Sequence, residues 1–270
     1  YMKTTIIKNS KIDKMNIFYK KIYLFFRYFF HKYIKNITNP KYYPYYYDGV
    51  ATRHNCSFLQ NKDFLKAYNR GKKSFNFYYE MPFRAHQSIW SSNNAFELDG
   101  DFIEFGTGKG FTMTCVLESL KEWNNSKKKL WLFDTFKPAP LDQDGKQDGK
   151  ETCRFYANNI EEIKNNFAEW KNINFIEGKL PETLKDVLDK NKITKISFVH
   201  VDLNFPKVEY ECLEYVWPLI TKGGIILFDD YAYNGFEKSY ELMNNFAKKV
   251  NKLILTTPSV FRALDNEAVS

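Results

Sequence analysis

From residue 101 onward, short apolar runs alternate with stretches in which apolar residues recur every three or four positions. The short runs are typical of buried β-strands, and the longer stretches are typical of amphipathic helices. The predicted strands cover 102–105, 130–133, 174–176, 195–201 and 225–228. The predicted helices cover 111–123, 156–169, 182–190, 207–220 and 235–249. This alternation predicts a doubly wound α/β fold with a mostly parallel sheet.

Two further strands, near 252–256 and 260–264, are expected to close the sheet as an antiparallel C-terminal hairpin, which makes seven strands in all. Gly223 and Gly224 are expected to turn the chain into the fifth strand. Ligands of such sheets bind at the carboxyl ends of the strands. The residues that follow each strand are therefore the first candidates for a functional site.

The first part of the chain has a different pattern. Residues 16–35 predict a helix in which Lys20, Arg27, His31 and Lys35 share one stripe, and aromatic and aliphatic residues cover the rest. Arg27 interrupts the apolar run too early for this helix to span a bilayer. We expect a basic, aromatic helical arm in 1–47, a lid or linker segment in 48–98, and one α/β domain in 99–270.

Charge separates the arm from the rest of the chain. Of the net charge of +8, residues 1–47 carry +9, whereas the remaining 223 residues carry −1. A nearly neutral body argues against nucleic-acid binding. Two interpretations of the arm stay open: its basic stripe faces an anionic membrane surface, or the helix packs on the body or on a second copy of the chain.

The cysteines and the lack of a leader pattern bear on the compartment. The four cysteines show neither a CxxC pair nor the spacing of a zinc site, which is typical of a protein of a reducing compartment. No small-residue cleavage site follows the apolar run, so a secretory signal is not expected. We expect a cytoplasmic protein, with peripheral contact to the inner membrane face under the first interpretation of the arm.

A glycine-rich turn follows the first strand of the body. Gly106, Gly108 and Gly110 stand at alternate positions between the apolar strand and the next predicted helix. Glycine suits such a turn because the backbone visits angles closed to other residues and because a Cβ would collide with a ligand. The spacing is E-x-G-x-G-x-G and lacks the third glycine of the G-x-G-x-x-G pattern, so a nicotinamide dehydrogenase is not expected.

Acidic residues stand at the ends of the other strands. Asp134 ends the second strand, where an acidic side chain can accept hydrogen bonds from ribose hydroxyls. Asp202 ends the fourth strand, and Asp229 and Asp230 end the fifth. Three carboxylates that meet repel one another unless a cation lies among them. Oxygen ligands without cysteine favour Mg²⁺ or Ca²⁺ over zinc.

Four motifs together resemble the macrocin O-methyltransferase family, which are metal-dependent enzymes that methylate sugar hydroxyls. The motifs lie at 101–110, 132–136, 200–204 and 223–231, and the likeness covers roughly 80–265. The first is similar to motif I of class I S-adenosylmethionine-dependent methyltransferases. The resemblance implies a Mg²⁺ ion, or another divalent cation that prefers oxygen, on Asp202, Asp229 and Asp230. It also implies a set that binds S-adenosylmethionine: Glu104, Gly106, Thr107, Gly108, Gly110, Asp134, Thr135 and Gly178.

One departure from the family concerns the general base. Many members have Asp-Gly-Asp at the fourth strand end, whereas this chain has Asn204 in place of the second Asp, and an amide takes up no proton at neutral pH. The predicted catalytic group is Asp202, His200 and Asn204. Three sources of the base function stay open: His200, His86 folded over the site, or a hydroxyl made acidic by the cation itself.

Two hypotheses of function remain. The first is an O-methyltransferase that acts on a sugar hydroxyl of a cell-surface glycan precursor or of a glycosylated metabolite. The second is an inactive binding or scaffold protein with a methyltransferase fold at the membrane surface. Asn204 supports the second hypothesis, whereas the intact glycine turn and the three carboxylates favour the first.

Overall fold

The computed structural model describes residues 45–48, 50–52, 54–75, 80–137, 159–190, 192–231, 233, 236–256 and 262–265. The arm helix expected over 16–35 lies outside these residues. The chain divides into two compact units, one made of Tyr1–Cys56 with Tyr78–Glu80 and the other of Ser57–Phe77 with Met81–Ser270. In the first unit, strands β1 (Tyr45–Tyr47) and β2 (Val50–Thr52) pair antiparallel.

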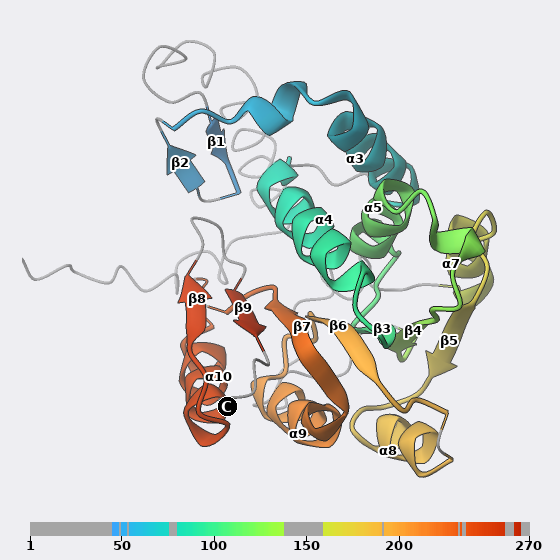
Figure 1. Ribbon diagram of the computed structural model, residues 1–270, viewed down its shortest axis with the longest axis vertical. Coiled ribbons are helices and arrows are strands. Elements are labelled where there is room, and N and C mark those ends of the chain that lie inside the picture. The colour runs from blue at the N-terminus through green and yellow to red at the C-terminus, as the bar shows by residue number, and fades with distance from the viewer. Residues whose placement is uncertain are drawn as a thin grey trace, which may run out of the picture. The chain divides into compact units, whose positions relative to one another are not determined.

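The second unit is built on a seven-stranded sheet in the order β5-β4-β3-β6-β7-β9-β8 (Figure 1). Its strands are β3 (Asp101–Phe105), β4 (Leu130–Asp134), β5 (Ile173–Glu177), β6 (Ile196–Val201), β7 (Ile220–Phe228), β8 (Ile254–Thr256) and β9 (Arg262–Asp265). Strands β3 to β7 pair parallel, and β9 pairs antiparallel with both β7 and β8. The predicted α/β class with a mostly parallel sheet is confirmed.

The strand order reverses between β3 and β6. From β3 the chain adds β4 and then β5 on one side, and it returns to place β6 and β7 on the other side. Parallel sheets of this kind bind ligands at the carboxyl ends of the strands, beside the point of reversal. The ends of β3 and β6 are therefore where the fold itself favours a site.

Helices cover both faces of the sheet (Figure 1). Helices α4 (Pro82–Phe96), α5 (Phe111–Ser119) and α7 (Ile160–Asn166) share one core with Phe102 and Leu132. Helices α8 (Glu182–Asp189), α9 (Pro206–Val216) and α10 (Glu237–Lys249) share the other core with Ile103 and Phe133. Successive strand residues point to opposite faces, which explains why these strands are apolar throughout.

Helix α3 (Lys62–Ser74) and the short 3-10 helix η2 (Ser57–Gln60) precede α4. Gly71 allows α3 to approach α5 closely, because a Cβ at this position would lie 2.2 Å from the Cys115 sulfur. Two more 3-10 helices, η3 (Trp123–Asn125) and η4 (Trp217–Leu219), follow α5 and α9. Among the residues that the structure describes, no helix is both long enough and apolar enough to cross a membrane.

Two expected boundaries differ from the structure. The helix expected over 111–123 ends at Ser119, and the chain continues into η3. Gly223 and Gly224 do not precede the fifth strand, as expected, but lie inside β7. There the register slips, because Ile220 and Ile225 of β7 oppose Ile196 and Phe198 of β6. The glycines thus form an irregularity within a strand, and the left-handed backbone of Gly223 (φ +80°) accommodates it.

Candidate functional site

The glycine turn lies at the end of β3, against the end of β6. A Cβ on Gly106 would lie 1.9 Å from the carbonyl oxygen of Asp202, so only glycine lets these two strand ends come together. A Cβ on Gly110 would lie 2.4 Å from the ring of Phe167. By contrast, a Cβ on Gly108 would meet no described atom within 4 Å. Gly108 is thus the glycine whose outer side faces open space.

Asp134 braces this turn. One carboxylate oxygen accepts hydrogen bonds from the backbone N–H groups of Thr107 and Gly108, both at 2.9 Å. The other oxygen accepts one from the N–H of Phe136, also at 2.9 Å. The sequence led us to expect ribose hydroxyls as the partners of Asp134, whereas in the structure this carboxylate holds backbone donors of the glycine turn.

The remaining residues of the expected cofactor set make local contacts. The hydroxyl of Thr135 lies 3.4 Å from the carbonyl oxygen of Lys137. The N–H of Gly178 donates to the carbonyl oxygen of Asp134 at 3.0 Å, and a Cβ on Gly178 would collide with Thr183. The neighbouring Glu177 is exposed and forms an ion pair with Lys137 at 2.6 Å. These contacts account for Gly178 by packing alone.

Glu104 forms a buried pair with His200. The two residues are register partners on β3 and β6, and a Glu104 carboxylate oxygen (Oε1) lies 2.9 Å from His200 Nδ1. The side chains are 2% and 0% exposed. Burial raises the pKa of the Glu104 carboxyl, and the hydrogen bond with His200 opposes that shift. A residue of the expected cofactor set therefore also orients a histidine.

Two of the three predicted metal ligands meet in the structure, and His200 joins them. One ligand atom from each of His200, Asp202 and Asp229 lies within 4.8 Å of the others. The strand ladder positions both aspartates, since the N–H of Asp202 donates to Phe105 (2.8 Å) and that of Asp229 donates to Val201 (3.0 Å). The sheet register therefore brings residues from two separate strands to one point.

Arg84 supplies a cation to this group. Its guanidinium, carried by the first turn of α4, forms an ion pair with Asp229 and lies 3.4 Å from an oxygen of Asp230. We call Asp202, Asp229 and Asp230 the carboxylate cluster. The exposed ring of Tyr233 lies 5.9 Å from the Arg84 guanidinium carbon. The sequence argument required a cation among these carboxylates, and the structure places Arg84 against two of them.

Burial and mutual repulsion weaken the acidity of the cluster. The pKa of Asp202 lies well above its ordinary value because the carboxyl is desolvated and lies near Asp229 and Asp230. The pKa of Asp230 rises to about 7, first through burial and then through the charge of Asp229. Arg84 opposes both shifts. Buried carboxyl groups whose pKa values are raised by desolvation and by charged neighbours are typical of functional sites.

Glu209, which the sequence did not single out, supports the loop behind Asp202. It lies in the first turn of α9, is 6% exposed, and accepts hydrogen bonds from backbone N–H groups of Leu203, Asn204 and Phe205. Ser239 of α10 donates to it at 3.3 Å. Burial raises the pKa of Glu209 to about 7.

Two further residues that the sequence singled out, Asn204 of the predicted catalytic group and His86 as a candidate base, have other surroundings. Asn204 is exposed and has a left-handed backbone (φ +60°), a conformation that asparagine tolerates well, so the turn explains this residue. His86 packs against the rings of Phe58 and Phe64, with its ring centre 4.3 Å from that of Phe58. Residues two apart on a helix do not share a face, so His86 cannot accompany Arg84 to the cluster.

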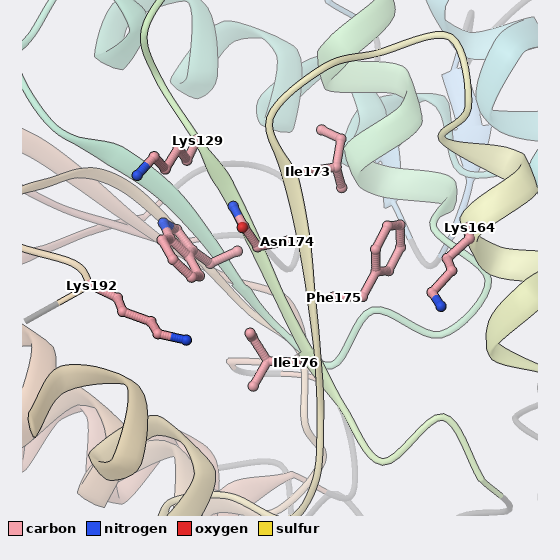
Figure 2. A pocket seen from close by; sticks show the side chains of 8 residues that line it. Lys129, Lys164, Ile173, Asn174, Phe175, Ile176 and Lys192 are labelled. Atoms are coloured by element: carbon pink, nitrogen blue, oxygen red, sulfur yellow. The ribbon is translucent and has the colours of Figure 1, made fainter. Parts of the chain in front are cut away.

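A separate hollow of about 640 Å³ follows the edge strand β5. Figure 2 shows Ile173, Asn174, Phe175 and Ile176 of this strand, with the ammonium groups of lysines around them. The lysines are Lys129, Lys164 and Lys192. None of the residues predicted from the sequence to bind cofactor or metal lines this hollow, so the candidate site is the one at the strand ends.

The residues at the strand ends fit the groups that the sequence implies. Glu104 Oε2 and Thr107 Oγ1 are buried and meet no partner of full hydrogen-bond geometry among the described residues, although the Thr107 hydroxyl lies close enough to Glu104 to lower the pKa of its carboxyl. A buried polar atom without a partner is costly, which favours a polar ligand at this point. The oxygen-rich cluster of Asp202, Asp229 and Asp230 is the kind of donor set that divalent cations bind.

Comparison with known proteins identifies the family of the chain. The family model described as macrocin O-methyltransferase (TylF) matches residues 84–259. A curated protein of Streptomyces olivaceus, "8-demethyl-8-(2,3-dimethoxy-alpha-L-rhamnosyl)-tetracenomycin-C 4'-O-methyltransferase", is 23% identical over 140 residues, which are 49% of this chain and 53% of that protein. The chain thus spans about half the length of the curated relatives it matches.

Solved structures share the fold. The O-methyltransferase NovP superposes with a TM-score of 0.57 at 17% identity, over 68% of this chain and 80% of NovP. The calicheamicin methyltransferase CalS11 superposes with a TM-score of 0.56 at 16% identity, over 80% of this chain and 95% of CalS11. At these identities the likeness concerns the fold.

Proposed function

The chain belongs to the macrocin O-methyltransferase family, and from that premise we propose that it transfers the methyl group of S-adenosylmethionine to a sugar hydroxyl. A divalent cation bound at the carboxylate cluster is part of the proposal. The acceptor is a sugar of a glycan precursor or of a glycosylated metabolite. The relative from Streptomyces olivaceus, whose name includes a rhamnosyl group, supports a sugar acceptor.

One observation carries this proposal: the glycine turn and the carboxylate cluster adjoin. The backbone of Gly106 lies so close to Asp202 that a Cβ on it would come within 1.9 Å of the Asp202 carbonyl oxygen. A methyl donor bound over the turn and an acceptor held at the cluster would therefore be neighbours. Holding two reactants in this way lowers the entropic part of the barrier.

When bound, the cofactor would supply the methyl group as an electrophile, and a divalent cation would lower the pKa of an acceptor hydroxyl. The chain's own residues have distinct tasks. Asp134 holds the N–H groups of the turn in place, and Glu104 Oε2, a buried oxygen, would accept a hydrogen bond from an ammonium group. Arg84 balances the charge of Asp229 and Asp230. The exposed ring of Tyr233 offers an apolar surface to a sugar.

The test is methyl transfer by the full chain. Labelled S-adenosylmethionine is offered with nucleotide sugars and with glycan extracts, with EDTA present and then with Mg²⁺ or Mn²⁺ restored. We expect transfer that stops in EDTA and returns with the metal, and that is lost in Asp229→Asn. Transfer that continues in EDTA would remove the metal from the proposal. Calorimetry that detects no binding of S-adenosylmethionine would favour the inactive scaffold instead.

We also propose that the basic arm in residues 1–47 brings the enzyme to an anionic membrane surface, where lipid-linked glycan precursors are found. The net charge of +9 in this segment supports the proposal. Co-sedimentation of the full chain with vesicles of anionic lipid, compared with vesicles of neutral lipid, tests it. Equal recovery with both kinds of vesicle would contradict it.

A further inference from the structure

The glycine turn is held through both its N–H and its carbonyl groups. Asp134 accepts hydrogen bonds from the N–H groups of Thr107 and Gly108, both at 2.9 Å. The carbonyl oxygens of Lys109 and Gly110 accept hydrogen bonds from side chains of α7 and α5. Gly108 and Gly110 have left-handed backbones (φ +51° and +86°), and glycines without such bonds would sample many conformations. The origin of the bonds to the two carbonyls therefore matters for a ligand over the turn.

Asn166, the last residue of α7, makes the first of these bonds. Its side-chain amide donates to the carbonyl oxygen of Lys109 at 3.0 Å. The backbone carbonyl of Asn166 accepts a hydrogen bond from Nη2 of Arg70, which stands in α3. Asn166 thus joins the guanidinium of Arg70 to the turn, although the three residues belong to three separate segments of the chain.

A second line of hydrogen bonds runs from Arg70 to the turn through α5. Arg70 Nη1 donates to Ser74 Oγ at 2.9 Å, and the Ser74 hydroxyl donates to Thr114 Oγ1 at 3.1 Å. Thr114 donates to the carbonyl oxygen of Gly110 at 2.7 Å, the nearer of two carbonyl acceptors. A helical threonine often bonds to the carbonyl four residues earlier, but this hydroxyl also accepts from another helix. Because every donor points away from the charged guanidinium, the bonds polarise and strengthen one another.

Arg70 is itself fixed and shielded from water. Its side chain is 13% exposed, its Nε donates to Glu169 at 2.5 Å, and its guanidinium carbon lies 4.8 Å from the centre of the Trp170 ring. A planar guanidinium has donors on both edges and can hold Ser74 and Asn166 at once, whereas a lysine ammonium is a point charge on a flexible stem. Arg70 is therefore suited to keep α3, α7 and the turn in one arrangement.

We propose that Arg70 is a positioning residue for the methyl donor, because its two lines of hydrogen bonds hold the glycine turn in the shape that S-adenosylmethionine binds. This rests on the proposed function, since the donor is the ligand proposed for that turn. A turn already fixed in its binding shape loses less conformational entropy on binding, so the ligand binds more tightly. Arg70 precedes residues 84–259, which the family model matches, so the assignment comes from tertiary contacts alone.

The test compares Arg70→Met with Lys66→Met in the full chain. Lys66 stands one turn earlier on α3 and forms an ion pair of the same length, 2.5 Å, with Glu118 of α5, but no hydrogen bond joins this pair to the described turn. In calorimetry the affinity of Arg70→Met for S-adenosylhomocysteine should fall about tenfold, whereas that of Lys66→Met should not change. The KM for S-adenosylmethionine should rise by the same factor in Arg70→Met, while the KM for the sugar acceptor stays constant.

Hydrogen exchange separates an effect on the turn from a general loss of stability. In ligand-free Arg70→Met, the amides of 106–110 should exchange about tenfold faster, whereas those of β7 should stay as protected as in the wild type. Asn166→Leu removes the amide that bonds to Lys109 and should cause a smaller loss of affinity. Because Arg70 and Asn166 belong to one line, the double variant should lose less affinity than the two single losses combined.

The outcomes separate this inference from the proposed function. A folded Arg70→Met that binds S-adenosylhomocysteine and protects the turn as the wild type does would overturn the role of Arg70 and leave the proposed function intact. Equal losses of affinity in Arg70→Met and Lys66→Met would also overturn it, as would equal acceleration of exchange in the turn and in β7. A wild-type chain that binds no S-adenosylhomocysteine would overturn the proposed function and this inference together.

Discussion

The guanidinium of Arg84 forms an ion pair with the carboxylate of Asp229, although 145 positions separate the two residues in the chain. Arg84 stands in the first turn of α4, and Asp229 follows the last residue of β7. The side chains are only 11% and 8% exposed. Because both charges are largely removed from water, each is compensated mainly by the other. Removing one of them would leave the other buried without compensation, at a cost to the fold and to the site.

Replacing Arg84 is expected to destabilise the metal-free protein. Arg84→Met retains most of the volume but leaves the buried carboxylates of Asp229 and Asp230 without their counter-charge. The expected loss in the free energy of unfolding, measured by urea denaturation in EDTA, is about 3 kcal/mol. A divalent cation should restore more stability to this variant than to the wild type, because it supplies the missing positive charge.

The matched control for this experiment is Lys195→Met. Lys195 pairs with Asp99 at 2.6 Å, but the two side chains are 60% and 74% exposed, so solvent screens the pair. We expect almost no change in stability and no added response to metal. If the stability of Arg84→Met changed as little as that of this control, Arg84 would not stabilise the fold by compensating the charges of Asp229 and Asp230.

Gly108 and Gly110 of the glycine turn should respond differently to alanine. Gly108→Ala meets no described neighbour within 4 Å, so it should cost only the strain of a left-handed backbone, about 1–2 kcal/mol. Its methyl group would nevertheless enter the space over the turn, so the affinity for S-adenosylhomocysteine in calorimetry should fall at least tenfold. Gly110→Ala, whose Cβ would lie 2.4 Å from Phe167, should destabilise the fold more strongly. Unchanged affinity in a folded Gly108→Ala would place the cofactor elsewhere.

Glu209 should make stability depend on pH. Burial raises its pKa from 4.5 to about 7 in the folded protein. Between about pH 4.5 and 7 the folded state holds a proton on Glu209 that the unfolded state has lost, so the free energy of unfolding falls as the pH rises. The stabilising contribution of Glu209 is therefore fully present below about pH 4.5 and is lost as the pH rises through about 7. Relative to Glu209→Gln, which does not titrate, the wild type should lose on the order of 3 kcal/mol between about pH 4.5 and 8.

Urea denaturation in EDTA at several pH values measures this difference. Glu211→Gln on the same helix is the matched control, because Glu211 is exposed. A constant difference between the wild type and Glu209→Gln across this range would contradict the prediction. It would mean that the N–H groups of the loop over 203–205 keep Glu209 charged in the folded state.

Tyr233 should contribute more to binding of the sugar acceptor than to binding of the methyl donor. Its ring is 39% exposed and lies 5.9 Å from the Arg84 guanidinium carbon, at the edge of the carboxylate cluster. We expect Tyr233→Ala to raise the KM for the sugar acceptor about tenfold while the KM for S-adenosylmethionine stays constant. Tyr215→Ala, on an equally exposed tyrosine of α9, is the control and should change neither constant. Equal effects on the two KM values would argue against acceptor binding by Tyr233.

The local pattern of the sequence determined the strands, the glycine turn and the acidic strand ends. Periodicity and turn residues depend on near neighbours in the chain, so they can be read without coordinates. Asp202 and Asp229 could be expected to meet because parallel strands end at one edge of a sheet. Gly106 could be assigned to the turn from the spacing of the glycines, and Glu104 to the cofactor set from the resemblance to the family.

Only the tertiary structure decided how these groups are partnered. Arg84 reaches Asp229 because α4 packs on the sheet, and nothing near Arg84 in the sequence signals that contact. Glu104 meets His200 because β3 and β6 are neighbours in a register that depends on the whole sheet. Asp134 binds backbone N–H groups that exist as donors only once the turn has formed. These contacts join distant segments, and the packing energy that selects them is shared by the entire core.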